Sequence, residues 1–228
     1  FSSNLPVVIL ENWGAGTPGT EGYTPGFWAI IEPDENGDQR AEMLDPLHIG
    51  TRCGMRRRGR SSANWPKYAL ALEAQDEQGE DKGIRPLGMP RESDWVLSGR
   101  YQFDRALMRN SLIYRLSNET VEFAVRTRFV EVFNSTNGED ISYADDYFGV
   151  YELMEKIKRD DARVPVAEIG PFDTREPAVS GGYMFKKDAL DPGDSGFTVN
   201  TMGTFGWVEP KEVEVHRSQK AWLEGWLN

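Results

Sequence analysis

The sequence predicts an α+β fold, built on a mostly antiparallel β-sheet with a few packed helices. The first observation is size: 228 residues, 39% of them hydrophobic, can bury a sizeable core. The second is a series of short apolar or alternating segments bounded by turn residues, which is typical of strands. The third is helical spacing in at least two segments, one in the middle of the chain and one at its end.

Strand character recurs along the chain. Between the first two such segments, a Gly/Pro/Thr-rich loop is predicted over 14–26. Asn36-Gly37 is a hairpin signal within a turn predicted over 34–39. The predicted strands are 4–12, 27–33, 68–76, 125–133, 181–188 and the beginning of 147–160, with 93–99 a short strand or turn.

The clearest helix is predicted over 105–118. Asp104 is suited to cap its N-terminus, and Asn118 is suited to end it. Apolar residues at every fourth position form one stripe, which two neighbours widen: Met108, Leu112 and Leu116, with Leu107 and Tyr114. We therefore expect this helix to be mostly buried.

A second helix is predicted at the end of the segment 211–228. Four large apolar side chains share one face of it: Trp222, Leu223, Trp226 and Leu227. We expect that face to pack against another surface, and an exposed apolar face often marks a partner interface. Self-association through 217–228 follows as an expectation.

The composition excludes several classes of function. A formal net charge of -11 argues against nucleic acid as the main partner, and the apolar runs are too short for membrane insertion. The single cysteine, Cys53, allows no internal disulfide and no zinc-thiolate cluster, and we expect it to be a buried hydrophobe. The acidic pairs Asp145-Asp146 and Asp160-Asp161 are expected in surface loops, so no metal ligands are assigned.

One segment reverses the acidic balance. Four arginines occupy five positions, Arg56, Arg57, Arg58 and Arg60, and no acid occurs between Asp45 and Glu73. Arginine gives bidentate hydrogen bonds to phosphate oxygens, and a glycine beside it lets the backbone approach a ligand. The segment is therefore either a phosphate-binding turn, or a solvated turn whose charges balance the acidic remainder of the protein.

Six ordered segments resemble the CotH kinase family, which is named after a spore coat protein. They are "RRRGRSSANWPKYALALE" (56–73), "LGMPRESDWVL" (87–97), "DRALMRNSLIYRLSN" (104–118), "RTRFVEVF" (126–133), "YFGVYELMEKIKRDDARV" (147–164) and "SGGYMFKKD" (180–188). The shared pattern is an Arg-Gly-x-Ser-Ser turn before Pro-Lys, an Asp-Trp, an Arg-Asn pair in a helix, and Gly-Val-Tyr leading to Glu-Lys-Ile.

The resemblance implies an atypical protein kinase that binds ATP with Mg²⁺ and phosphorylates Ser or Thr of a partner protein. It implies a strand-rich nucleotide-binding half and a helical half, in which a Trp-Asp motif carries the metal-binding aspartates. Because this sequence has no such motif, we expect it to cover the first half. The expected organisation is a single truncated domain over 1–228, with leading strands in 1–55, a family core in 56–188 and a terminal helix in 211–228.

The resemblance also suggests which residues bind the cofactor. The catalytic residues stay unknown. Arg109 is expected to point at a carboxylate inside the fold, and Glu155 is expected to brace Lys67, by analogy with other kinases. The full set of expected nucleotide-binding residues is Arg58, Arg60, Ser61, Ser62, Lys67, Arg109 and Glu155.

Two further readings come from other classes of protein. The chain is alternatively a non-catalytic structural or assembly module that keeps the kinase-like fold, within a secreted or cell-surface multidomain protein. Its seven tryptophans would suit a carbohydrate-binding module, but tryptophans in strands and in a terminal helix are more often core. Nucleotide binding separates the first reading from the assembly module.

Overall fold

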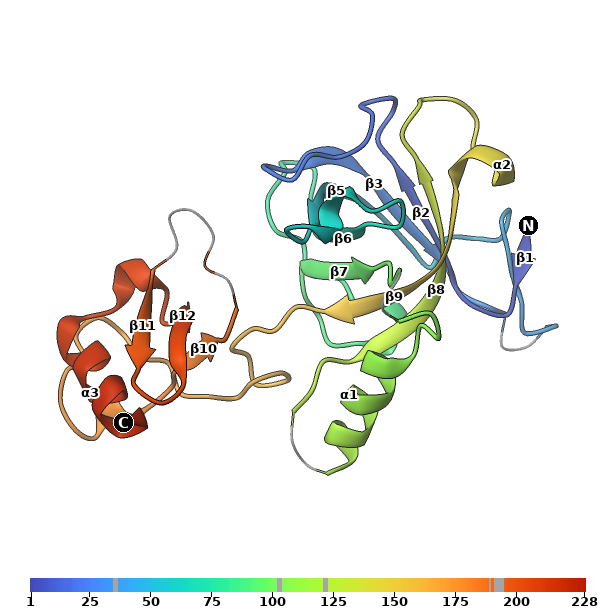
Figure 1. The fold of residues 1–228 in the computed structure, drawn as a ribbon. Helices are drawn as coiled ribbons and strands as arrows, with labels where there is room; N and C mark the ends of the chain where they lie inside the picture. The colour runs from blue at the N-terminus through green and yellow to red at the C-terminus, as the bar shows by residue number, and fades with distance from the viewer. Residues whose placement is uncertain (35–36, 102–103, 121–122, 189, 191–194) are drawn as a thin grey trace. The chain divides into compact units, whose positions relative to one another are not determined.

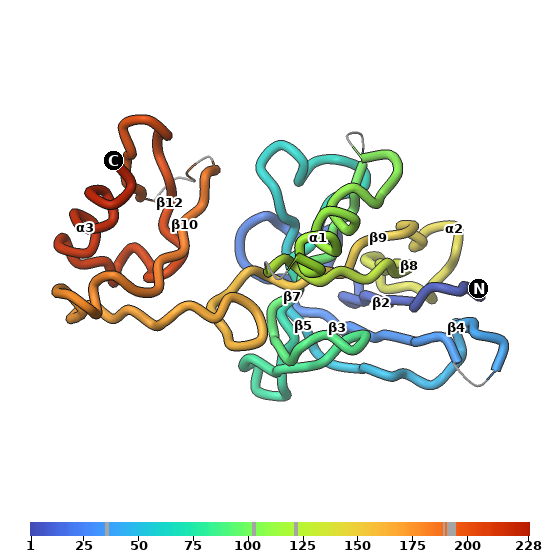
Figure 2. The backbone as a smooth tube through the Cα atoms, turned by 90° about the horizontal axis from the view of Figure 1, so that it is seen from below, coloured from blue at the N-terminus to red at the C-terminus, as the bar shows by residue number. Residues whose placement is uncertain are grey.

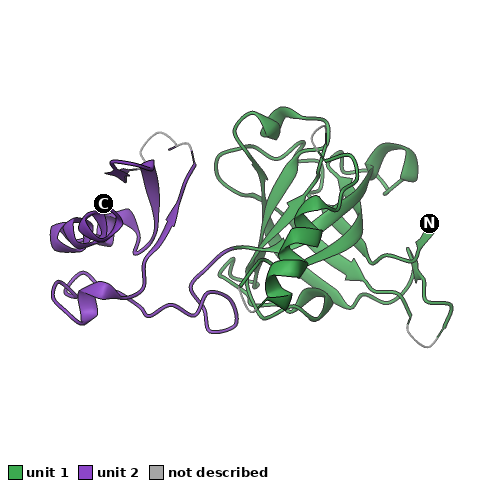
Figure 3. Ribbon diagram, turned by 60° about the horizontal axis from the view of Figure 1, so that its bottom comes forward, with its two compact units in different colours: residues 1–156 green, residues 157–228 purple. Residues whose placement is uncertain are grey.

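The computed structural model describes residues 1–34, 37–101, 104–120, 123–188, 190 and 195–228. The chain divides into two compact units, residues 1–156 and residues 157–228 (Figure 3). The first unit holds a closed barrel, and the second holds a three-stranded sheet with a helix. Asn36 of the predicted hairpin turn lies outside the described residues.

Seven strands close the barrel (Figure 1). Each neighbouring pair is antiparallel except β2 and β8, which run parallel with Val7 opposite Glu131. In barrel order the strands are β2 (Val7–Glu11), β3 (Thr24–Ile31), β5 (Ile49–Arg58), β6 (Ala69–Gln75), β7 (Asp94–Ser98), β9 (Tyr147–Glu155) and β8 (Thr127–Ser135).

Alternate side chains of every strand fill the barrel, because successive residues of a strand point to opposite faces. On β9, for example, Tyr151 and Leu153 belong to the central core, whereas Met154 packs on the outside against Val96. The largest interior side chains are completely covered: Trp28, Trp95, Tyr151, Leu10, Ile30, Met55, Leu70 and Leu72. The candidate site lies on the outer surface of the barrel that is packed in this way.

The expected α+β fold with packed helices is wrong. The fold is mostly β, and the part of the chain that the structure describes has only three short α-helices. The predicted strands are confirmed, most of them with shorter bounds, but β3 begins earlier than predicted and β8 ends later. The two-residue strands β1 and β4, strand β5 and two strands of the second unit were not predicted. Strand β5 ends with Arg56, Arg57 and Arg58, so its C-terminal end lacks the apolar alternation that would indicate a strand.

Helix α1 (Arg109–Glu119) lies against the barrel, but the expectation that its apolar stripe is buried is wrong. Met108, Leu112 and Leu116 are 52%, 55% and 47% exposed. The half-buried positions are Asn110, Ser111, Tyr114 and Ser117, so the helix turns its more polar side to the barrel. The buried barrel surface under the helix carries a carboxylate. Because a buried carboxylate needs hydrogen-bond donors, polar side chains of the helix face it instead of leucines.

Short elements complete the first unit. β1 (Ser2–Ser3) pairs with β4 (Ala41–Glu42) beside the N-terminus (Figure 2). Helix α2 (Tyr143–Asp146) precedes β9, and its N-cap Ser142 accepts from Asp145 N. The 3-10 helices η1 (Ser62–Asn64) and η2 (Pro86–Gly88) lie in the connections that follow β5 and β6.

The second unit has its own core. Its sheet has the order β10 (Met184–Lys186), β12 (Gly203–Glu209) and β11 (Gly196–Val199). After the 3-10 helices η3 (Ala178–Ser180) and η4 (Glu212–Glu214), helix α3 (Arg217–Leu227) buries Leu223 among Phe197, Val199 and Phe205. Trp222 and Leu227 pack at the edge of this cluster, and Trp226 is 69% exposed. No helix among the described residues has the length and apolar character to cross a membrane.

Candidate functional site: an anion-binding cleft

The arginine run of β5 serves two purposes. Arg57 is fixed from within, because its guanidinium donates to Pro18 O (2.7 Å) and Ala63 O (3.1 Å) and lies over the Tyr68 ring. Arg56 lies over the Tyr23 ring, 5.4 Å from its centroid. Arg58 and Arg60 are exposed. The first two arginines therefore hold the strand and its loop in place, and the other two face solvent.

A tight turn after β5 brings Ser62 to the site. Gly59 has φ +97°, a left-handed conformation that favours glycine. A side chain at this position would also overlap Ser62 Oγ. The glycine thus allows the chain to fold back into η1, with Ser62 close to the end of the strand.

A cleft of about 410 Å³ opens at this point on the outer surface of the barrel. Its walls come from η1, the start of β6, the residues after β7 and the N-terminus of α1. Three expected residues, Ser62, Lys67 and Arg109, line it. Arg58, Arg60, Ser61 and Glu155 do not belong to its lining, although Arg58 pairs across the strands with Ala69, which does.

Lys67 is held at the inner side of the cleft. Its ammonium group donates to Val150 O and lies 4.9 Å from the centroid of the Tyr151 ring. Burial lowers the pKa of Lys67, and the negative charge of Glu131 opposes that shift in part. The ammonium is therefore poorly hydrated, so an anion in the cleft would gain more from it than from an exposed lysine.

Arg100 is one of the cleft residues that sequence reasoning missed, together with Trp65, Ser98 and Tyr101. It lines the cleft, and its Nε donates to Glu152 Oε2 at 3.0 Å. Asn110, with its amide oriented by its hydrogen-bond partners, accepts from Arg100 Nη2 and, at 3.3 Å, from Arg100 Nη1. The available signal was Glu152 itself, a charged residue within the otherwise apolar run of β9.

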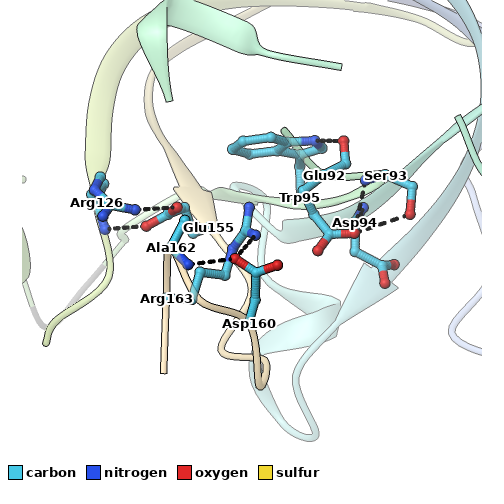
Figure 4. A network of polar contacts seen from close by, with 9 residues as sticks. All are labelled: Glu92, Ser93, Asp94, Trp95, Arg126, Glu155, Asp160, Ala162 and Arg163. Atoms are coloured by element: carbon cyan, nitrogen blue, oxygen red, sulfur yellow. Dashed lines mark hydrogen bonds and ion pairs between the residues drawn. The ribbon is translucent and has the colours of Figure 1, made fainter. Parts of the chain in front are cut away.

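Glu155 lies elsewhere. It accepts from the Arg126 guanidinium and main-chain nitrogen, as Figure 4 shows, whereas Lys67 bonds to Val150 O. The structure therefore brings Glu155 to Arg126, not to Lys67, and the expected brace is not formed. Of the two glutamates, Glu152 is the one that binds a residue of the cleft lining, Arg100.

Asp104 is the one acidic residue in the described lining of the cleft. Its side chain caps α1 from outside the helix, since Oδ2 accepts from Arg109 N at 3.0 Å. Its Oδ1, 3.8 Å from Arg109 Nε, has no hydrogen-bond partner. Arg109, whose side chain is 75% exposed, thus lies beside the carboxylate that precedes its own helix. The described residues hold no group of three His, Cys, Asp or Glu side chains that suits a metal ion.

Aromatic side chains form another wall of the cleft. Trp65 and Tyr101 both line it, with ring centroids 6.0 Å apart. A planar heterocycle can stack on such rings, because every base has a π-face. The cleft therefore offers an aromatic wall of two rings, tilted by 48° to each other, beside a cluster of donors.

Together these groups define an anion-binding cleft. Three cations, Lys67, Arg100 and Arg109, meet hydroxyl groups of Ser62 and Ser98 around a single carboxylate. This excess of positive charge and hydrogen-bond donors suits the oxygens of a phosphate group.

The chain belongs to the CotH kinase family: residues 55–223 match the family described as CotH kinase protein. The resemblance noted in the sequence is thereby confirmed. Family membership indicates a kinase-like domain and, in general terms, the use of ATP and a metal ion. No curated protein matches the chain.

Proposed function

We propose that the cleft binds the phosphates of ATP, and that the chain is the nucleotide-binding part of a kinase that phosphorylates Ser or Thr of a partner protein. The observation that carries the proposal is the convergence of Lys67, Arg100 and Arg109 on one cleft, next to two hydroxyl groups. Phosphoryl transfer depends on positioning and on neutralising phosphate charge, and these groups suit that task.

Each wall of the cleft has a part in this proposal. Lys67 and Arg100 hold phosphate oxygens, and Ser62 donates a further hydrogen bond. Trp65 and Tyr101 stack on the adenine. Mg²⁺ in nucleotide sites takes one or two carboxylates plus phosphate oxygens and water, so Oδ1 of Asp104, which accepts no hydrogen bond and lies 3.8 Å from Arg109 Nε, fits as a single protein ligand. The metal supplies neutralisation of phosphate charge when bound.

Calorimetric titration with MgATP tests the proposal. We expect binding by the wild-type chain and at least tenfold weaker binding by Lys67→Ala, because a poorly hydrated cation is lost. Lys82→Ala is the matched control, since Lys82 is exposed and lies outside the lining of the cleft. The absence of heat at millimolar nucleotide, or equal losses in both variants, would reject the proposal.

A second candidate function is a non-catalytic assembly module of a secreted or cell-surface protein. The exposed stripe of α1 and the exposed Trp226 favour it, because such surfaces suit protein partners. Within the second unit, Leu223 is already covered, so self-association through 217–228 would depend on Trp226. Sedimentation of the wild type and of Trp226→Ser tests this self-association. A concentration-dependent dimer that the substitution abolishes supports self-association, and a monomer at all concentrations rejects it.

A further inference from the structure

Glu152 is a buried carboxylate that lies between the barrel and helix α1. Its side chain is 1% exposed. Its neighbours Tyr151 and Leu153 point into the barrel, so Glu152 points outward, as Met154 does beneath Tyr114 of α1. Across the sheet it pairs with Ser98, which lines the cleft. The carboxylate therefore lies directly behind the wall of the proposed phosphate site.

Both oxygens of Glu152 are engaged, each by a different part of the site. Oε2 accepts from Arg100 Nε at 3.0 Å, and Oε1 accepts from Ser111 Oγ at 2.5 Å. Ser111 Oγ in turn accepts from Thr127 Oγ1 on β8 at 2.9 Å. One carboxylate thus joins Arg100 in the segment that follows β7, helix α1 and two barrel strands.

This arrangement determines where the Arg100 guanidinium lies. Arg100 is 25% exposed on its side chain, with Nε on Glu152 and both Nη2 and Nη1 on Asn110. A long arginine side chain loses much rotamer freedom when it binds a ligand, unless other contacts already fix it. With all three nitrogens in contact with Glu152 or Asn110, the guanidinium is fixed where it lines the cleft, and the N–H groups that these two residues do not use are the donors left for a ligand.

We propose that Glu152 is the positioning residue of the cleft: it holds Arg100 toward the phosphates and, through Ser111, ties helix α1 to the same site. The inference rests on the proposed nucleotide binding and deepens it. Glu152 contacts no ligand itself; it acts through Arg100. Because α1 also carries Asn110 and Arg109, the same carboxylate aligns the helix and the arginine together.

A purely structural ion pair makes a different prediction. Loss of such a pair lowers the melting temperature but changes the affinity for every ligand of the cleft to a similar degree. Loss of a positioning residue weakens only the ligands that reach Arg100. The ratio of the affinity for inorganic tripolyphosphate to that for adenosine therefore separates the two roles.

The experiment is a calorimetric titration of the full chain with each of these two probes. We expect Arg100→Lys and Glu152→Gln to weaken tripolyphosphate binding about tenfold or more, and adenosine binding less than twofold. Ser111→Ala should weaken tripolyphosphate about threefold, and Ser111→Thr, which keeps the hydroxyl, should restore it. The control is Glu119→Gln on the exposed side of α1, which should match the wild type.

Melting temperatures show whether each variant folds, and if Glu152→Gln does not fold, the two Ser111 variants decide the outcome. Unchanged tripolyphosphate affinity in the folded variants, or equal losses for both probes, would overturn the role of Glu152 alone. If the wild type binds neither probe nor MgATP, the proposed function falls and this inference falls with it.

Discussion

The carboxylate of Glu155 accepts two hydrogen bonds from Arg126, one from the guanidinium at 2.8 Å and one from the main-chain nitrogen at 2.9 Å. The Glu155 side chain is fully covered, and its own main-chain nitrogen donates to Arg126 O. The pair therefore clamps the end of β9 to the residue that leads into β8. Because both strands belong to the closed barrel, we expect this contact to stabilise the fold.

Arg126→Ala should lower the free energy of unfolding by about 3 kcal/mol, because it removes a guanidinium that neutralises a buried carboxylate. Urea denaturation measures this. Arg115→Ala is the matched control: Arg115 pairs with Glu119 on the exposed surface of α1, and such pairs contribute about 0.3–0.5 kcal/mol. Equal losses in the two variants would contradict the assignment of Glu155 and Arg126 to the barrel frame.

The pH dependence of anion binding should follow Lys67. Burial lowers its pKa below the usual 10.5, so the free protein loses this proton at a lower pH than an ordinary lysine would allow. As the pH is raised, tripolyphosphate affinity should therefore begin to fall before pH 10.5 is reached. Lys67→Arg keeps its charge over the same range and should keep its affinity. The unfolded chain binds more protons between the two pKa values, so the contribution of Lys67 to stability rises with pH in that window. Titrations from pH 7 to pH 10 test the first point; a fall of the same size in Lys67→Arg would count against it.

The apolar stripe of α1 should contribute little to stability. Leu112→Gln and Leu116→Gln should each change the free energy of unfolding by less than about 0.5 kcal/mol, because both side chains are largely exposed. Leu97→Ala, inside the barrel, should cost about 2–5 kcal/mol. Thermal or urea unfolding compares them, and a large loss for Leu112→Gln would mean that the helix packs the other way round.

The thiol of Cys53 should be inert in the folded protein. It is buried in the barrel interior, and burial raises its pKa to about 12. Since the thiolate is the reactive form, an aromatic disulfide reagent at pH 8 should react only after unfolding in urea. Rapid reaction of the native chain would indicate that the barrel opens at β5, where Cys53 lies.

The sequence was sufficient for the strands that alternate cleanly. β6 repeats an apolar residue at every second position, so its place and inner face followed from pattern alone. α1 shows the limit of such patterns. Its stripe of Met108, Leu112 and Leu116 predicts burial, but periodicity does not reveal that the surface beneath is occupied by Glu152, which binds Ser111 instead.

The site was predictable only in part, for a similar reason. Ser62 and Lys67 lie in the segment that carries the family pattern, and Arg109 lies in its helix, so local sequence indicated them. Local sequence could not decide whether Glu152 or Glu155 lies near the cleft. The two lie three positions apart on one strand and so point to opposite faces. Which face carries the cleft depends on how β7 and α1 meet, and that is a tertiary fact.

The parallel pairing of β2 with β8 has a consequence for synthesis of the protein. Val7 finds its partner β3 within a short stretch of chain, but its other neighbour is Glu131, which leaves the ribosome much later. Until β8 arrives, one edge of β2 is an unsatisfied row of peptide groups, open to any extended chain nearby. Closing the ring requires the most distant pairing in the barrel, and such pairings are slow to form. The nascent chain therefore passes through an open-edged sheet, and protection of that edge by a chaperone would matter most before residue 135 has been made.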